Sequence, residues 1–213
     1  MLFRSGVTGA ASMILGNVVA ITQRNVKRLL AYSSIAHAGY IMIGFAAANQ
    51  TGATGILFYV IVYALTNLGA FGVVAALANR TGGDDLEHFN GMARRAPFLS
   101  LLMLIFILSL AGIPPLGGFF GKFYLFASAV QRDSTNFGLL WLVILGIVMS
   151  AVSLYYYLIV LKHFYVTGAK DESHIETPTY INAALAAVAL AVVLLGAFPE
   201  PVLALLKGLV AQL

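Results

Sequence analysis

The sequence predicts an all-α protein: a polytopic membrane helix bundle of about six transmembrane helices, the fourth of them broken. Composition is the first observation, since 61% of the 213 residues are hydrophobic and 9% are charged, with a mean hydropathy of +0.93. Such a chain has too little polar surface to cover a soluble globule. Apolar runs near the ~20 residues that cross a bilayer recur from end to end. We therefore expect residues 1–213 to form a single transmembrane domain.

Six apolar runs are long enough to be spans, and polar or turn-forming segments separate them. In chain order the predicted spans are Val7–Gln23, Leu29–Ala48, Thr54–Ala78, Pro97–Gln131, Gly138–Val166 and Tyr180–Phe198. The separating segments read RNVKR, NQTG, NRTGGDDLEHFNGMARRA, RDSTN and TGAKDESHIETP. The residues after Phe198 are too few to span again and are expected to form an amphipathic tail at the membrane interface.

The fourth run is too long for one straight span. A continuous helix over Pro97–Gln131 would be about 52 Å long, against a hydrocarbon core of ~30 Å. Two prolines that lack a backbone donor and three glycines that tolerate unusual backbone angles occur together in its middle. The sequence therefore predicts a helix break at Gly112, Pro114, Pro115, Gly117 and Gly118. In transporters, such breaks at membrane depth commonly form ion sites.

Lys122 follows this break, in the first turn or two of the second half-helix, and no acidic residue occurs between it and Asp133. An ammonium at bilayer depth costs at least roughly 2.5–3.5 kcal/mol, so it usually faces a bundle interior or water and marks an ion or proton path. We predict that Lys122 carries protons. The alternative is a side chain that snorkels to the membrane surface.

Other polar residues in the spans are weaker candidates. His37 could relay protons or be a packing histidine, and Lys27 could guide protons at the mouth of the path or anchor the helix at the interface. Polar support of the path, or hydrogen bonding between helices, is expected of Tyr32, Ser33, Ser34, Thr66 and Asn67. Tyr155, Tyr156 and Tyr157 are interpreted as packing and interfacial aromatics. The cluster Asp84, Asp85, Glu87 and His88 lacks metal-ligand spacing and is interpreted as a solvated loop.

Lysine and arginine are distributed unequally between the two sides of the predicted bundle. An even number of spans puts both termini on one side and the loops after spans one, three and five on the other. Those loops hold Arg24, Lys27, Arg28, Arg80, Arg94, Arg95, Lys162 and Lys170, against Arg4, Arg132 and Lys207 on the side of the termini. The bias predicts that both termini lie on the outer, periplasmic side.

Several classes of chemistry are excluded. The chain has no cysteine, which removes disulfides, zinc-thiolate sites and cysteine nucleophiles. It also contains no phosphate loop, GxSxG elbow, HExxH motif or dinucleotide fingerprint, and its basic residues lie scattered in short loops, which disfavours nucleic-acid binding. We expect no metal site and no covalent or redox chemistry in this chain alone.

Two long segments resemble a known family. The stretch QRNVKRLLAYSSIAHAGY from Gln23 and the stretch LSLAGIPPLGGFFGKFYLF from Leu108 are similar to the antiporter-like membrane subunits of respiratory complex I, and most similar to the N-type subunit of NADH-quinone oxidoreductase. In M-type relatives a glutamate matches Lys122, and in L-type relatives an acidic residue follows the lysine, whereas Phe123 follows here. The resemblance covers the C-terminal part of such a subunit, its second half-channel repeat and final helix.

The resemblance implies a proton-translocating subunit, in a bacterial plasma membrane, of an enzyme that couples quinone reduction to proton pumping. It implies partner subunits that hold NADH, FMN, iron–sulfur clusters and quinone, none of which this chain is expected to bind. It places His37 along a polar axis that leads to Lys122. Two alternatives remain open: a subunit of a multi-subunit cation/proton antiporter or membrane-bound hydrogenase, and a passive scaffold of a membrane arm.

Overall fold

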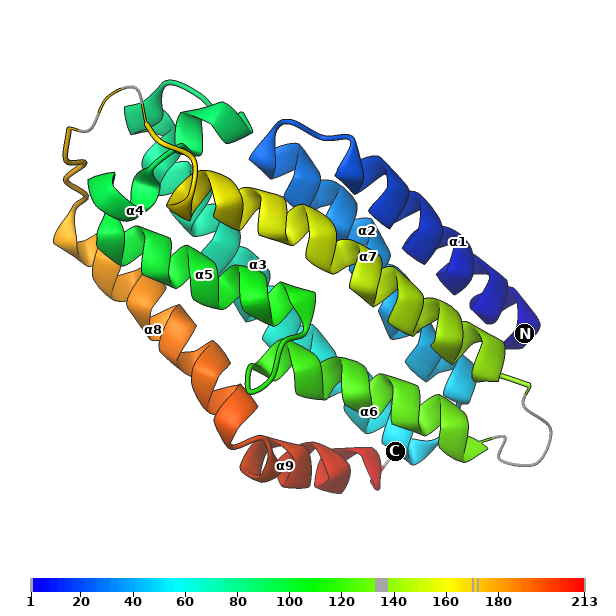
Figure 1. Ribbon diagram of the computed structural model, residues 1–213. Helices are drawn as coiled ribbons and strands as arrows, with labels where there is room; N and C mark the ends of the chain where they lie inside the picture. Colours follow the sequence, from blue (N-terminus) through cyan, green and yellow to red (C-terminus); the bar gives the residue numbers. More distant parts are fainter. Residues whose placement is uncertain (1, 133–137, 170, 172, 213) are drawn as a thin grey trace.

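The computed structural model describes residues 2–132, 138–169, 171 and 173–212, without the side chains of Leu2 and Phe3; Asp133 and Lys170 lie outside this part. The described chain is helical, with one isolated β-bridge between Asn25 and Asp85. Its α-helices are α1 (Leu2–Ile21), α2 (Val26–Ala47), α3 (Gln50–Thr81), α4 (Met92–Arg95), α5 (Pro97–Ala111), α6 (Gly117–Arg132), α7 (Leu140–Tyr165), α8 (Thr179–Ala197) and α9 (Glu200–Val210), with a 3₁₀ turn, η1, at Leu86–Phe89 (Figure 1).

The predicted helix bundle is confirmed. Among the described residues, α2, α3, α7 and α8 are long and apolar enough to cross a membrane by length and composition. The helix α1 and the pair α5–α6 run beside them in the bundle (Figure 1) and complete the predicted six. The helix α3 starts before the predicted span because the side chain of Asn49 accepts a 2.7 Å hydrogen bond from the Gly52 N–H and so caps its first turn. It also ends later than predicted, at Thr81, where Gly82 adopts the left-handed conformation.

The predicted break in the fourth span is also confirmed. The helix α5 starts with Pro97 in its first turn and ends at Ala111, and α6 starts at Gly117. Gly112 adopts the left-handed conformation, with φ of 84°, and its N–H donates to the carbonyls of Leu108 and Ser109. Glycine tolerates this conformation without the penalty that a side chain imposes. The connection then passes through Pro114 and Pro115, which are exposed on the side of the bundle.

Close helix contacts fix the arrangement around the break. The helices α1 and α2 pack closely at Gly16, where an added Cβ would lie 2.5 Å from the backbone nitrogen of Ala36. The absence of a side chain at Gly16 allows this contact. A Cβ at Gly196, near the end of α8, would overlap the carbonyl oxygen of Pro115. The end of α8 is therefore seated directly against the connection between α5 and α6, and both half-helices are held in the bundle.

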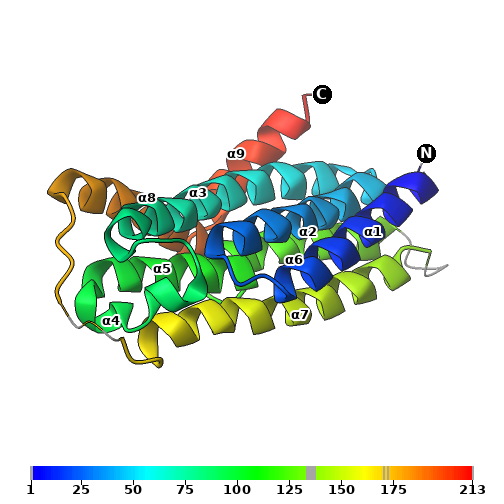
Figure 2. The same ribbon diagram turned by 90° about the horizontal axis from the view of Figure 1, so that it is seen from above.

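The tail forms α9, which leaves the bundle obliquely on the side of α3 and α8 (Figure 2). Its buried residues include Leu203 and Leu206, which pack with Phe58 and Val62 of α3. The opposite face leaves Leu205 65% exposed. The tail is thus an amphipathic helix, while its position at a membrane interface stays a prediction.

The basic loops gather at one end of the bundle, where the connection between α1 and α2 meets the segment between α3 and α5. The Val26 N–H donates to the Asp84 carbonyl, and the Leu86 N–H donates to the Arg24 carbonyl, both at 2.8 Å. At the same end, His163 of α7 and Asn90 form a 2.6 Å hydrogen bond. Both marked ends of the chain lie towards the other end of the bundle (Figure 1), which agrees with an even number of spans.

Candidate functional site around Lys122 and His37

The ammonium of Lys122 is held at the carboxyl end of α5. It donates hydrogen bonds to the carbonyl oxygens of Leu110 at 3.0 Å and Ala111 at 3.1 Å, and to the hydroxyl of Ser150 on α7 at 2.9 Å. The residue is 5% exposed. The last carbonyls of a helix have no partner inside the helix and carry a partial negative charge, which stabilises a nearby cation. Lys122 therefore caps α5, and the snorkelling alternative is wrong.

Gly112 makes room for this ammonium. A Cβ at Gly112 would lie 3.1 Å from Cδ and 3.2 Å from Nζ of Lys122, closer than ordinary van der Waals contact. The same glycine supplies the left-handed turn that ends α5. The helix break thus both exposes the carbonyls that receive Lys122 and leaves the space that its side chain fills.

Tyr40 connects Lys122 to His37. The Lys122 Nζ lies 5.1 Å from the centre of the Tyr40 ring, within the range of a cation–π contact. The Tyr40 ring in turn packs edge-on against His37, with 5.6 Å between ring centres. All three residues are buried. The His37 ring therefore points into the bundle on the Lys122 side, as a polar axis from His37 to Lys122 requires.

His37 has a hydrogen-bond partner at each ring nitrogen. Its Nδ1 lies 2.6 Å from the Tyr59 hydroxyl on α3, and its Nε2 lies 3.1 Å from the Tyr157 hydroxyl on α7. Tyr157 also hydrogen-bonds to Ser33. A neutral imidazole donates from one nitrogen and accepts at the other, whereas a charged one donates from both. Since hydroxyls both donate and accept, His37 can gain a proton without losing either partner.

A family model described as "NADH:quinone oxidoreductase/Mrp antiporter, TM" matches residues 5–153, which include the break, Lys122 and His37. The chain belongs to this family. It is therefore an integral membrane protein. Residues 154–213, with the end of α7 and all of α8 and α9, lie beyond the match.

Comparison with individual proteins also places the chain in this family. The chain is 44% identical to NADH-quinone oxidoreductase subunit N of Desulforamulus reducens over 97% of its own length and 42% of that relative's. It is 35% identical, with a TM-score of 0.80, to a chain of respiratory complex I from Thermus thermophilus, over 94% of this chain and 44% of that one. The predicted resemblance to N-type subunits is confirmed. The chain spans less than half the length of these relatives.

A structure with lower sequence identity shares the fold. A chain of the Mrp complex from Dietzia superposes with a TM-score of 0.89 at 20% identity, over all of this chain and 47% of that one. At this identity the likeness concerns the fold alone. The overall helical fold is therefore common to this chain and the Mrp chain.

The other polar residues that were predicted to support the path do not gather at one place. Ser33 joins the His37 cluster, whereas Ser34 bonds back to the carbonyl of Leu30 on its own helix and Tyr32 is half-buried at the core. Thr66 contacts Ser109, whose hydroxyl accepts from the Gly118 N–H at 3.2 Å. Thr66 thus supports the break. Asn67 is half-buried and makes no side-chain hydrogen bond to a described residue.

Lys27 lies away from this cluster, in the first turn of α2 at the end of the bundle. Its ammonium pairs with Asp84 at 2.9 Å, and its side chain is 41% exposed. Asp85 accepts a hydrogen bond from Asn25, and among the described residues no group of three histidine or acidic side chains could hold a metal ion. This loop ties the helix ends together, and a role of Lys27 in proton entry stays a prediction.

Sequence reasoning missed several members of the cluster. The interpretation of Tyr155–Tyr157 as packing and interfacial aromatics fits Tyr155, which is 59% exposed, but it overlooked the hydrogen bond of Tyr157 to His37. Tyr156 donates to the side chain of Asn17 on α1 at 3.0 Å. Helical spacing was the available signal, since polar residues repeat at intervals of three and four: Ser33, His37 and Tyr40; Tyr59, Tyr63 and Thr66; Ser150, Ser153 and Tyr157.

Proposed function

We propose that the chain is a proton-translocating module of the membrane arm of an NADH–quinone oxidoreductase, in which Lys122 stores a proton and His37 relays it. The single observation that carries the proposal is the buried Lys122 ammonium on the carbonyls of a broken helix, joined through Tyr40 to a histidine with two hydroxyl partners. The family and its N-type relatives support the same function.

In this proposal the chain performs no redox chemistry. Quinone reduction elsewhere in the assembly drives the proton movement, and the partners are the other membrane and peripheral subunits of complex I, which hold NADH, FMN, iron–sulfur clusters and quinone. The chain itself corresponds to the second half-channel repeat plus the final helix of an N-type subunit. It lies in a bacterial plasma membrane with both termini on the periplasmic side, as the lysine and arginine bias favours.

The proposed path uses groups that exchange protons without leaving a buried partner unsatisfied. Proton loss from Lys122 leaves an amine that still donates two hydrogen bonds and can itself accept one. Proton gain by His37 is compatible with both tyrosine hydroxyls, because these can turn from donor to acceptor. Water molecules that bridge polar groups would carry the proton between the two sites across the Tyr40 ring.

Substitution of Lys122 in the intact assembly tests the proposal. Lys122→Ala should strongly reduce NADH-driven proton pumping while the assembled complex stays in the membrane. Lys122→Arg should also impair pumping, because a guanidinium keeps its proton at accessible pH. Unchanged pumping by an assembled Lys122→Arg complex would exclude a protonation cycle at this residue and leave a role for charge or packing.

The second candidate is a cation/proton antiporter subunit, which the mention of Mrp antiporters in the description of the matching family favours. Both candidates use the same lysine and the same break. Reconstituted vesicles distinguish them: a complex I module moves protons only when NADH and quinone are supplied, whereas an antiporter subunit moves protons in response to a sodium gradient alone.

A further inference from the structure

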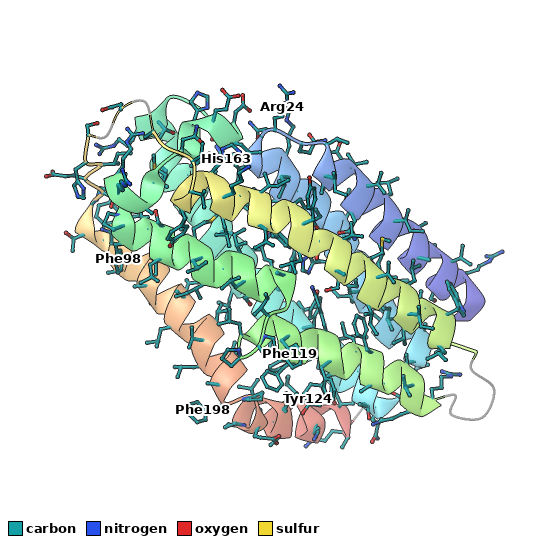
Figure 3. The ribbon with its side chains drawn as sticks, in the orientation of Figure 1. Arg24, Phe98, Phe119, Tyr124, His163 and Phe198 are labelled. Carbon is teal, nitrogen blue, oxygen red and sulfur yellow. The ribbon has the colours of Figure 1, made fainter. Side chains whose placement is uncertain are left out.

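A lateral groove leads from the outer surface of the bundle to Lys122. It has a volume of about 390 Å³ and lies between the α5–α6 connection and α7. Its apolar walls are Phe119, Phe123, Phe126, Ile147, Ala151 and Leu154, with Lys122 and Ser150 as its polar groups. Figure 3 shows Phe119 beside the connection. Phe123 and Ile147 are each 54% exposed, so the groove opens onto the apolar side of the bundle.

Among the described residues, the ammonium at this groove has no anionic partner. Its three hydrogen bonds go to two backbone carbonyls and one hydroxyl, all of them neutral. The described ion pairs are Lys27–Asp84 and Arg95–Asp171, both at the end of the bundle that carries the basic loops. The Ser150 hydroxyl accepts from Lys122, and its own proton has no acceptor among the described residues. A buried cation and a free hydroxyl donor therefore line an apolar groove, and this combination complements a carboxylate.

We propose that this groove binds a fatty acid from the bilayer, with its acyl chain along the phenylalanine wall and its carboxylate between Lys122 and Ser150. The acid can enter in its neutral form and give its proton to a neutral Lys122 amine, which leaves a carboxylate beside an ammonium and conserves the proton. This proposal uses the same lysine as the proposed function but assigns it a lipid ligand, which can be tested without measuring proton transfer.

Depth favours a fatty acid over a phospholipid. Lys122 precedes Arg132, the end of α6, by ten residues, which is about 15 Å of helix. A phospholipid would have to bury its charged phosphate and glycerol at this depth, and burying unpaired polar groups is costly. A carboxylic acid brings a single polar group: one oxygen of its carboxylate can accept from the Ser150 hydroxyl, and the other can accept the Lys122 N–H that otherwise donates to Ser150.

Photolabelling of the purified intact assembly tests the proposal without relying on proton pumping. A palmitate that carries a diazirine should label the peptides around Phe123 and Ala151. Oleate in excess over its dissociation constant should lower this labelling about tenfold by mass action, whereas methyl oleate, which lacks the carboxylate, should leave it unchanged. Equal competition by the ester would overturn the proposal, because labelling would then report only apolar contact.

Two matched variants of α7 localise the label. Ala151→Trp fills the groove and should abolish labelling, whereas Val148→Trp, at an exposed position of the same helix outside the groove walls, should retain it. Labelling that survives in Ala151→Trp would place the ligand elsewhere. Absence of labelling in the wild-type assembly would mean that the groove binds no fatty acid, and cross-linking of the groove to a helix of another subunit would mean that a protein segment occupies it. Either result would overturn the proposal.

Discussion

Replacement of Gly112 by alanine should separate the role of the lysine site from ordinary helix capping. Gly112 and Gly82 both end a helix in the left-handed conformation, with φ of 84° and 83°. A side chain in this conformation costs roughly 1–2 kcal/mol at either position. At Gly82 an added Cβ would meet nothing within 4 Å, whereas at Gly112 it would lie 3.2 Å from Nζ of Lys122. Gly82→Ala is therefore a control with the same backbone cost.

The difference between the two variants should come from Lys122. Displacement of the ammonium weakens hydrogen bonds that each contribute about 1.5–3 kcal/mol when one partner is charged. We expect Gly82→Ala to leave NADH-driven proton pumping near the wild-type rate in reconstituted vesicles, and Gly112→Ala to reduce it strongly at equal assembly, measured on native gels. If the two variants pump equally well, the position of the ammonium on the end of α5 is not required for function.

Three further substitutions probe neighbouring contacts. His37→Gln keeps an amide donor and acceptor but cannot carry a proton, so pumping should fall while assembly is retained; full pumping would exclude a relay at His37. Ser150→Ala removes one of the three acceptors of Lys122, worth about 1.5–3 kcal/mol, and should reduce pumping more than Ser128→Ala, whose buried hydroxyl donates to the Leu125 carbonyl on its own helix; equal effects would contradict this. Gly118→Ala would drive a Cβ into the Ser109 carbonyl and should destabilise the complex by roughly 1–3 kcal/mol; an unchanged thermal midpoint would be inconsistent with such tight packing.

The sequence predicted the break and the buried lysine because both depend on local signals. Pro114 and Pro115 interrupt an apolar run that is too long, and a lone ammonium in such a run needs a polar environment. The partners of Lys122 could not be predicted in the same way. Two of them are backbone carbonyls, which any residue provides, and the third, Ser150, lies on another helix. The hydroxyl partners of His37 likewise depend on how α2, α3 and α7 pack.

Lys27 shows another feature that the sequence could not predict, namely the partner of a residue at the end of a helix. From the sequence, we expected Lys27, ten residues before His37, to guide protons at the mouth of the path or to anchor the helix at the interface. Ten residues of helix extend about 15 Å, so one residue reaches the end of the bundle while the other stays in its centre. The structure pairs Lys27 with Asp84, a contact that depends on how the segment after α3 folds back over the start of α2. Helical spacing places residues on a face but does not tell which loop covers the end of that face.

The double proline creates the acceptors that Lys122 binds. In a continuous helix the carbonyl of each residue accepts from the N–H four positions later, so the carbonyls of Leu110 and Ala111 would depend on residues 114 and 115. Both positions are proline, which has no N–H. These are the two carbonyls to which Lys122 donates. The ammonium thus replaces two missing backbone donors. Without it, the two buried carbonyls would lack a hydrogen-bond partner and destabilise the folded protein, and with it they hold the ammonium in place. Because loss of its proton removes a donor and the positive charge at the end of α5, a change at Lys122 acts directly on the junction of the two half-helices and on Ser150 of α7.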